Sequence, residues 1–195
     1  MIRLGIFVSG SGTNCENIIR HFQHSDWVRT DLVVSNRADA FALTRAKRLG
    51  VQTLIVNREE FYNPEKLLTL LHGIDFIVLA GFLWMIPDFL IKAFPNRIIN
   101  IHPALLPKFG GKGMYGHYVH EAVKASGETE SGITVHYVNE VCDGGEILFQ
   151  ARTPLSPDDT PEDIASKIHL LEQEHFPRVI EEAFKRDKKL MSRSE

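Results

Sequence analysis

Short runs of apolar residues alternate, along the first hundred residues, with longer segments whose apolar positions recur at helical spacing. The apolar runs predict five strands, near residues 2–8, 31–35, 52–56, 75–80 and 97–101. The segments between them predict four helices, near residues 15–23, 40–49, 62–73 and 86–94. Nearly continuous apolar strands that alternate with helices are typical of a parallel sheet covered on both faces.

The pattern changes from about residue 116. The rest of the chain predicts a helix near 116–126, two longer strands near 131–138 and 146–153, and a last helix from Pro161 to about Phe184. A turn-rich segment joins the two strands, so we expect them to pair antiparallel. Thr160 stands at the N-cap position of the last helix. The predicted fold class is α/β, a doubly wound, mostly parallel sheet with C-terminal antiparallel strands and a long final helix.

No feature of the chain suggests a domain boundary. The sequence has no internal repeat, no low-complexity run and no Pro/Gly/Ser-rich linker. A length of 195 residues fits one domain. We therefore expect a single domain over residues 1–195, in which about 185–195 form a frayed tail.

Charge and cysteine content narrow the classes of partner. Lys and Arg total 22 against 25 Asp and Glu, so no overall basic field draws the chain to nucleic acid or to an anionic membrane. The apolar runs are far shorter than the roughly 18 residues that span a bilayer. Two cysteines, Cys15 and Cys142, cannot build a disulfide framework, and the first residues resemble a strand rather than a secretory segment. We expect a reducing, cytoplasmic setting and small-molecule substrates, for a monomer or a homodimer.

Small and polar residues follow the first predicted strand. The run Ser9–Asn14 (SGSGTN) lies between that strand and the first helix, where backbone N–H groups and a helix N-terminus can face an anion. The run lacks the lysine of a Walker P-loop, and Cys15 stands where a dinucleotide-binding fingerprint has its third glycine. The run predicts a phosphate cradle; a tight turn without a ligand is the alternative.

A second polar cluster follows the fifth predicted strand. Asn100 and His102 lie two residues apart at the carboxyl edge of the sheet, where open α/β proteins bind their ligands. In an extended chain they point to the same side. An amide beside an imidazole suits the stabilisation of an oxyanion and the transfer of a proton. The alternative is that His102 caps the strand end through a backbone hydrogen bond.

A third candidate is Asp143, in the turn Cys142–Gly145 between the last two predicted strands. This turn could present one carboxylate to a pocket, and Asp143 would raise the pKa of His102 if the two side chains met. An Asp-Gly turn is also an ordinary hairpin connection, which is the alternative.

Three further features suggest other chemistry. His117 and His120 have the spacing of zinc ligands on a helix, but no Cys or HExxH set accompanies them, so we predict no metal. Cys142 as a nucleophile lacks a basic setting, because Asp143 follows it. The glycine-rich run 110–113 is either a lid or a solvated turn.

Taken together, five segments resemble the glycinamide ribonucleotide formyltransferases, a family of folate-dependent purine enzymes. They are SGSGTN (9–14), SNRADA (35–40), LAGFLWMI (79–86), INIHPALLPKF (99–109) and SGITVHYVNEVCDGGEILFQ (131–150). The similarity spans residues 2 to about 184. Asn, His and Asp in this order resemble the signature of folate formyl transfer.

The resemblance implies an enzyme that transfers the formyl group of the cosubstrate 10-formyltetrahydrofolate to the amine of glycinamide ribonucleotide, without a metal or a covalent intermediate. It implies that Asn100 and His102 stabilise the tetrahedral oxyanion, and that Asp143 sets the charge of the imidazole and organises proton transfer. The implied binding residues are Gly12, Thr13, Asn14 and Glu172 for the ribonucleotide, and Leu83, Trp84, Ile86, Asn100 and Val141 for the pterin ring. The alternatives are a solvated helix carboxylate for Glu172 and core packing for the apolar side chains.

The sequence departs from the family pattern at two places. Trp84 stands where many relatives carry arginine, and the stretch 110–123 replaces a shorter loop that carries a histidine. Because of these changes, the resemblance does not extend to the folate-tail contacts or to loop closure. Formyl transfer to methionyl-tRNA, or formyltetrahydrofolate hydrolysis, would require a further domain, and we expect neither. A nucleotide-binding module without catalysis would use the glycine loop but would not need Asn100, His102 and Asp143.

Overall fold

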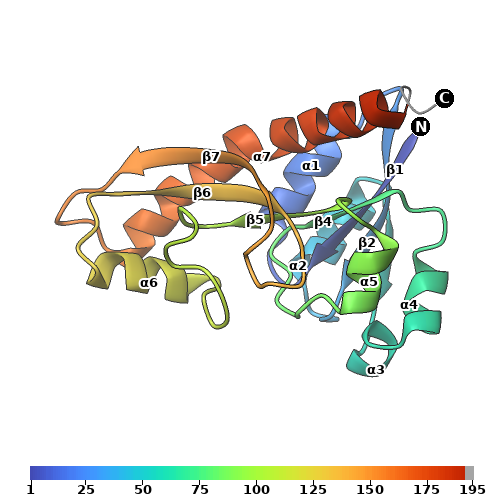
Figure 1. The fold of residues 1–195 in the computed structure, drawn as a ribbon, viewed down its shortest axis with the longest axis horizontal. Helices are drawn as coiled ribbons and strands as arrows, with labels where there is room; N and C mark the ends of the chain where they lie inside the picture. The colour runs from blue at the N-terminus through green and yellow to red at the C-terminus, as the bar shows by residue number, and fades with distance from the viewer. Residues whose placement is uncertain (192–195) are drawn as a thin grey trace. The chain divides into compact units, whose positions relative to one another are not determined.

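The computed structural model describes the backbone of residues 1–191 and the side chains of residues 1–187. One sheet has the strand order β3-β2-β1-β4-β5-β6-β7. The strands are β1 (Ile2–Val8), β2 (Val28–Ser35), β3 (Gln52–Ile55), β4 (Phe76–Leu79), β5 (Ile98–His102), β6 (Glu130–Tyr137) and β7 (Ile147–Pro154) (Figure 1). The helices are α1 (Thr13–Phe22), α2 (Phe41–Arg48), α3 (Arg58–Phe61), α4 (Pro64–Leu70), α5 (Asp88–Ala93), α6 (His117–Ala125) and α7 (Pro161–Met191).

The strand pairing confirms the predicted fold class. Strand β1 pairs in parallel with β2 and with β4, and the pairs β2–β3 and β4–β5 are also parallel. Strands β6 and β7 pair antiparallel, with Ile133 opposite Ala151. The sheet is therefore mostly parallel, with antiparallel C-terminal strands followed by the long helix α7.

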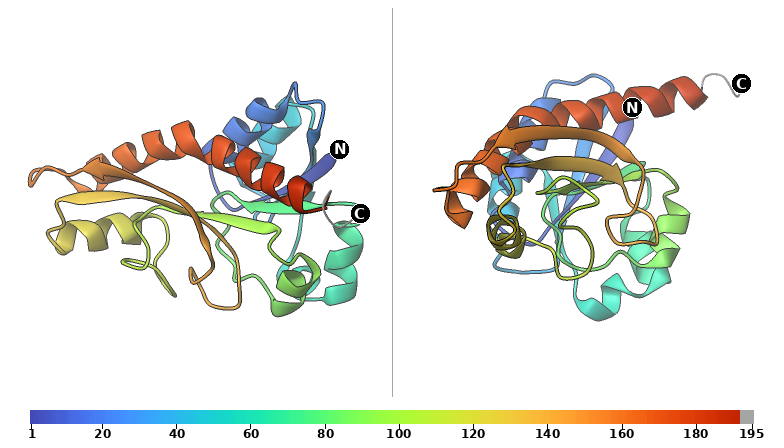
Figure 2. Two further views of the ribbon diagram at one scale, coloured as in Figure 1. Left: turned by 45° about the horizontal axis from the view of Figure 1, so that its top comes forward. Right: turned by 60° about the vertical axis from the view of Figure 1, so that its left-hand side comes forward.

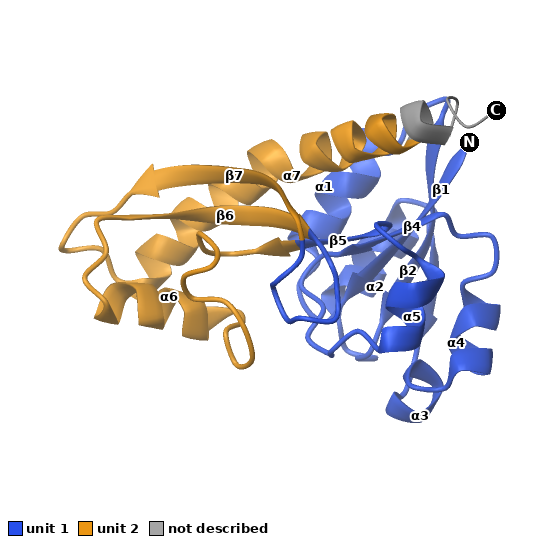
Figure 3. Ribbon diagram, viewed as in Figure 1, with its two compact units in different colours: residues 1–100, 137–145 blue, residues 101–136, 146–195 orange. Residues whose placement is uncertain are grey.

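The described chain divides into two compact units (Figure 3). Unit 1 contains Met1–Asn100 and Tyr137–Gly145, and unit 2 contains Ile101–His136 and the chain from Glu146 onward. Strand β5 crosses from unit 1 to unit 2 between Asn100 and Ile101. The single-domain organisation expected from the sequence stays a prediction.

In unit 1 the apolar strand residues form a core with the helices that flank them. On β1, Leu4, Ile6 and Phe7 have no exposed surface, which explains why that strand is an almost unbroken apolar run. Leu67 of α4 and Leu90 of α5 belong to the same buried cluster as Phe7. These contacts hold the carboxyl ends of β1 and β4 in fixed positions.

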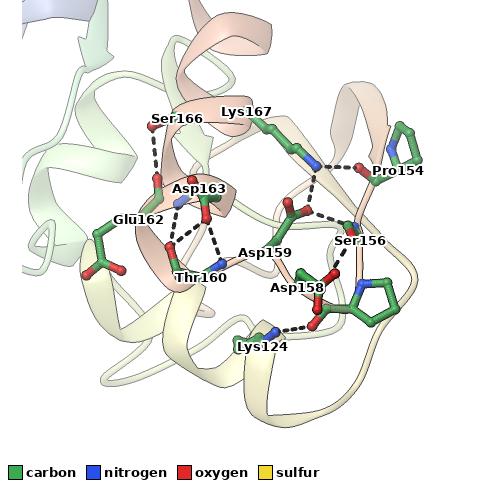
Figure 4. Close-up of polar contacts among 11 residues, drawn as sticks. Lys124, Pro154, Ser156, Asp158, Asp159, Thr160, Glu162, Asp163, Ser166 and Lys167 are labelled. Atoms are coloured by element: carbon green, nitrogen blue, oxygen red, sulfur yellow. Dashed lines mark hydrogen bonds and ion pairs between the residues drawn. The ribbon is translucent and has the colours of Figure 1, made fainter.

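In unit 2, helix α7 packs on β7 and on α6, and β7 pairs with β6 (Figure 2). The buried side chains there are Ile133, Val135, Val119, Val123, Ile164, Ile168, Phe176, Ile180 and Phe184. Helix α7 begins as the sequence predicts: Asp163 N–H donates to Thr160 Oγ1 at 3.2 Å, and Thr160 N–H donates to Asp163 Oδ2 at 2.9 Å. Figure 4 shows this reciprocal cap beside the ion pair of Lys167 with Asp159.

Several element bounds differ from the predicted ones. The predicted helix 62–73 is the shorter helix α4, because Asn63 caps its start and Pro64 disfavours helical geometry at the residue before it. A separate short helix, α3, precedes it outside the predicted range, with Asn57 as its cap. Strand β2 begins at Val28 rather than near 31. Helix α7 continues past Phe184 to Met191, where Lys185 pairs with Glu181 at 3.1 Å. Of the predicted frayed tail, 185–191 are helical and 192–195 lie outside the described residues.

None of the helices in the described chain has the length and apolarity to cross a membrane.

Candidate active site

The glycine loop 9–14 connects β1 to α1 in unit 1. Gly12 is the N-cap of α1 and has a φ of 77°, which favours glycine. A Cβ atom on Gly12 would lie 2.4 Å from the Cβ of Ala42, so the loop backbone and α2 touch too closely for any side chain. Gly12 provides no side-chain acceptor to the first N–H groups of α1, the type of group that binds an anion at the start of a helix.

Ser9 connects three loops at the carboxyl ends of the strands. Its hydroxyl donates to Asn36 Oδ1 at 2.7 Å and accepts from the N–H of Leu83 at 3.0 Å. Its own N–H donates to the carbonyl of Gly81 at 3.0 Å. Ser9 is buried, so these bonds are shielded from water. Sequence reasoning placed Ser9 in the glycine run but did not reveal that it links the run to the loop after β4.

The segment 83–86 presents apolar side chains after β4. Leu83 is 51% exposed, whereas Trp84 and Ile86 pack against the core cluster of unit 1. Trp84 stacks on Tyr62, with ring centroids 6.2 Å apart, and Phe61 meets Trp84 edge-on at 5.3 Å. Tyr62 also donates from its hydroxyl to the Met85 carbonyl at 3.1 Å. The segment is therefore held rigidly, with Leu83 turned to solvent and Trp84 packed on its neighbours.

The turn that contains Asp143 begins beside β5. The N–H of Val138 donates to the carbonyl of Ile98 at 2.9 Å, and the side-chain oxygen of Asn139 accepts from the N–H of Val141 at 2.9 Å. Asp143 adopts a left-handed conformation with φ 54° and is half-buried. A Cβ on Gly145 would lie 1.7 Å from the Tyr137 carbonyl oxygen, so only glycine fits there.

The same turn carries the thiol of Cys142 and the apolar side chain of Val141. Burial, followed by the charge of Asp143, raises the pKa of the Cys142 thiol. A thiol held in its protonated form is a poor nucleophile, which argues against covalent chemistry at Cys142. Val141 is 65% exposed and, like Leu83, offers an apolar surface to solvent within unit 1.

Strand β5 carries Asn100 and His102 on the same face, two residues apart. Asn100 is half-buried and stands opposite Leu79 of β4. His102 is 3% exposed, and its Nε2 lies 2.7 Å from the carbonyl oxygen of Phe109. A carbonyl only accepts, so Nε2 carries a proton in this arrangement. His102 therefore bonds to a backbone carbonyl, as expected under the alternative in which it caps the end of the strand.

A polar network in unit 2 fixes the segment after His102. Thr134 Oγ1 donates to the Ala104 carbonyl at 2.7 Å and accepts from the Leu106 N–H at 3.0 Å. Gln150 Nε2 donates to Thr134 Oγ1 at 2.9 Å and to the Leu106 carbonyl at 3.0 Å. Thr134 is fully buried, so the segment leaves β5 along a defined path.

The other candidate residues are divided between the units. The glycine loop, the segment 83–86, Asn100 and the turn with Val141 and Asp143 belong to unit 1, and His102 and Glu172 belong to unit 2. Glu172 lies on α7, mostly buried, with Oε2 3.6 Å from Nδ1 of His169.

The two helical histidines differ in their surroundings. His117 is exposed and pairs with Glu121 at 3.1 Å. His120 is buried, and its Nδ1 has no hydrogen-bond partner among the described residues. Burial, then the charges of His117 and His102, lowers the pKa of His120. Over residues 1–187, no group of three or more His, Cys, Asp or Glu side chains is arranged to hold a metal ion.

Comparison with known proteins gives one consistent result. A family model described as "Formyl transferase" matches residues 2–180. The chloroplastic phosphoribosylglycinamide formyltransferase of Arabidopsis thaliana is 44% identical over 89% of this chain, which spans 61% of that relative's length. The Haemophilus influenzae phosphoribosylglycinamide formyltransferase is 35% identical, over 92% of this chain and 86% of the relative. The crystal structure of glycinamide ribonucleotide transformylase 1 from Symbiobacterium toebii has a TM-score of 0.84 and 36% identity, over 92% of this chain and 86% of that one.

Proposed function

Because this chain belongs to the formyl transferase family, we propose that it transfers the formyl group of 10-formyltetrahydrofolate to the amino group of glycinamide ribonucleotide, a reaction of purine biosynthesis. The observation that carries the proposal is in unit 1. There, Ser9 links a loop suited to phosphate directly to an apolar segment suited to a flat ring. The names of the similar proteins agree with this acceptor.

The ribonucleotide phosphate is assigned to Gly12, Thr13 and Asn14. A phosphate dianion at the start of α1 would be bound by backbone N–H groups and stabilised by the helix dipole. The close contact of Gly12 with Ala42 supports this assignment, because it excludes any side chain at position 12, directly before the first N–H groups of α1. Glu172 is assigned to the ribose hydroxyls, to which a carboxylate can accept hydrogen bonds.

The pterin ring of the folate donor is assigned to Leu83, Trp84, Ile86 and Val141, with Asn100 beside it. The exposure of Leu83 and Val141 supports this, because both side chains leave apolar surface in unit 1 on which a flat ring could pack. Turn 139–144 has backbone N–H and carbonyl groups that could serve the polar edge of the ring.

The proposed reaction is direct acyl transfer. The amine nitrogen of the ribonucleotide attacks the formyl carbon, and a tetrahedral oxyanion forms. The bond from that carbon to N10 of the folate then breaks, and the proton lost by the amine moves to N10. Asn100 and His102 are assigned as hydrogen-bond donors to the oxyanion, and Asp143 as the group that keeps the imidazole charged and transfers the proton. Attack by an amine on an activated formyl group requires no metal ion.

We further propose that residues 1–195 act as one formyltransferase domain. The family match over residues 2–180 supports this, because it extends through both compact units.

The function is tested by mixing the protein with 10-formyltetrahydrofolate and glycinamide ribonucleotide and following tetrahydrofolate release by absorbance. We expect release that requires the ribonucleotide and saturates with it. Gly12→Val should raise KM for the ribonucleotide, because the new side chain meets Ala42 and distorts the cradle. Release at the same rate without the ribonucleotide would show a hydrolase instead. No release at all would refute the proposal, and an unchanged KM in folded Gly12→Val would refute the cradle.

A further inference from the structure

The glycine loop is held by a side chain from another element. Arg45 of α2 donates from Nε to the carbonyl oxygen of Ser11 at 2.9 Å. The same guanidinium forms an ion pair with Glu16, in the first turn of α1. A planar guanidinium fixes the relative position of two acceptors, so Arg45 ties the residue before Gly12 to the helix that follows it. These contacts all lie within unit 1.

The start of α2 contacts the loop through its backbone as well. The N–H of Ala42 donates to the carbonyl of Gly10 at 3.1 Å, and Gly12 approaches Ala42 so closely that no Cβ would fit. The guanidinium of Arg45 lies 4.9 Å from the ring centroid of Phe41, which limits its freedom. Because α2 and the loop are in direct contact, a change at Arg45 acts on the loop backbone.

Arg45 also changes the charge near the helix N-terminus. The Glu16 carboxylate would repel a phosphate bound at the start of α1. Arg20 pairs with Glu16 Oε1 at 2.7 Å, and Arg45 pairs with Oε2. These hydrogen bonds, first from Arg20 and then from Arg45, lower the pKa of Glu16, so the carboxylate stays ionised. Two cations around one anion leave the group with a net positive charge.

We propose that Arg45 is a positioning residue for phosphate binding: it fixes the Ser11 carbonyl and offsets the charge of Glu16, so that the N–H groups of 12–14 face a phosphate dianion. The inference rests on the proposed function, which places the ribonucleotide phosphate in this loop. Arg45 acts through the loop and does not touch the reacting atoms. Its loss should therefore weaken ribonucleotide binding and leave the chemical step intact.

The test compares Arg45→Gln with Arg48→Gln. Arg48 lies on the same helix, is exposed, and has its guanidinium 5.9 Å from the same Phe41 ring, so its replacement removes the same charge without touching the loop. We expect Arg45→Gln to raise KM for the ribonucleotide about 10-fold, with kcat and the donor KM within about 2-fold, since hydrogen bonds to charged groups contribute at this level. Arg48→Gln should match the wild type. Arg45→Lys should recover part of the loss, because it keeps the charge and one donor.

A second measurement uses inorganic phosphate and no turnover. Phosphate should raise the Tm of the wild type and of Arg48→Gln, and raise that of Arg45→Gln much less. Equal phosphate shifts in the wild type and Arg45→Gln, or an unchanged ribonucleotide KM, would overturn the inference. An equal KM increase in Arg48→Gln would also overturn it, since the effect would then be one of net charge. If Arg45→Gln does not fold, Arg45→Lys decides by the same readouts. A wild type that gains Tm with phosphate but forms no product would contradict the proposed function alone.

Discussion

The hydroxyl of Ser9 accepts a hydrogen bond from the N–H of Leu83 at 3.0 Å, so the proposed phosphate cradle and the proposed pterin segment share one buried contact. The same hydroxyl donates to Asn36 Oδ1. Two loops that would hold different substrates therefore depend on one side chain.

Ser9→Ala should weaken the binding of both substrates. Removal of the hydroxyl leaves the Leu83 N–H and the Asn36 amide without this partner, which costs about 1–3 kcal/mol. We expect KM to rise for the ribonucleotide and for the folate donor together, and Tm to fall by several degrees. Steady-state kinetics and calorimetry measure the two effects. Ser166→Ala, which removes an exposed hydroxyl from α7, is the control and should change neither. A rise in KM for only one of the two substrates would show that Ser9 does not couple the two loops.

Thr134→Val should destabilise the protein although it preserves the side-chain shape. The valine would leave the Ala104 carbonyl, the Leu106 N–H and the Gln150 amide without their shared partner in a fully buried site. We expect a loss of about 2–4 kcal/mol in the free energy of unfolding, measured in urea. Thr134→Ser keeps the hydroxyl and should lose only about 1 kcal/mol. Equal losses in the two variants would mean that packing, not the hydroxyl, stabilises the segment.

The two cysteines should alkylate slowly at neutral pH. Burial, the largest cause, raises the pKa of Cys15 to about 12, and burial also raises that of Cys142. Because the thiolate is the reactive form, iodoacetamide should modify Cys142 more slowly at pH 8 than it modifies a free thiol, and faster as the pH rises. Cys15, with no exposed surface, should react only on unfolding. Peptide mass spectrometry checks both sites; rapid labelling of Cys142 at pH 7 would contradict the raised pKa.

Alanine at Asn100 or His102 should affect rate far more than binding. Loss of one oxyanion donor or acid–base group lowers kcat by about 10²–10⁴. Asp143→Asn should also slow turnover, since an amide cannot accept the migrating proton. Circular dichroism provides the folding control. Near wild-type kcat in all three variants would assign these residues a structural role.

The sequence predicted the fold well where local patterns decide it. Unbroken apolar runs marked β1 and β4 because both faces of those strands are buried, and Thr160 with Asp163 marked the start of α7. Helix α3 was missed because it has only four residues, too few for a helical period, although Asn57 and Glu60 form a capping box. The end of α7 was missed because the sequence after Phe184 begins with a run of charged residues, 185–189.

The candidate site could be predicted only as separate segments. Pattern and resemblance named the glycine loop, the segment 83–86 and Asn100, and the family membership that they implied is confirmed. The contact that joins the glycine loop to the segment 83–86 was not visible, because Ser9 and Leu83 are 74 residues apart. The bond of Arg45 to Ser11 was not visible either, because these residues are 34 apart. Such pairs arise from strand order, which one-dimensional periodicity does not contain.

The fate of the formyl carbon tests the central claim most directly. The protein is incubated with glycinamide ribonucleotide and 10-formyltetrahydrofolate that carries a labelled formyl carbon, and the products are separated and identified by mass spectrometry. We predict that the label appears on the amino group of the ribonucleotide, in an amount equal to the tetrahydrofolate released. Label recovered as formate, or left on the folate while the ribonucleotide stays unmodified, would contradict the account.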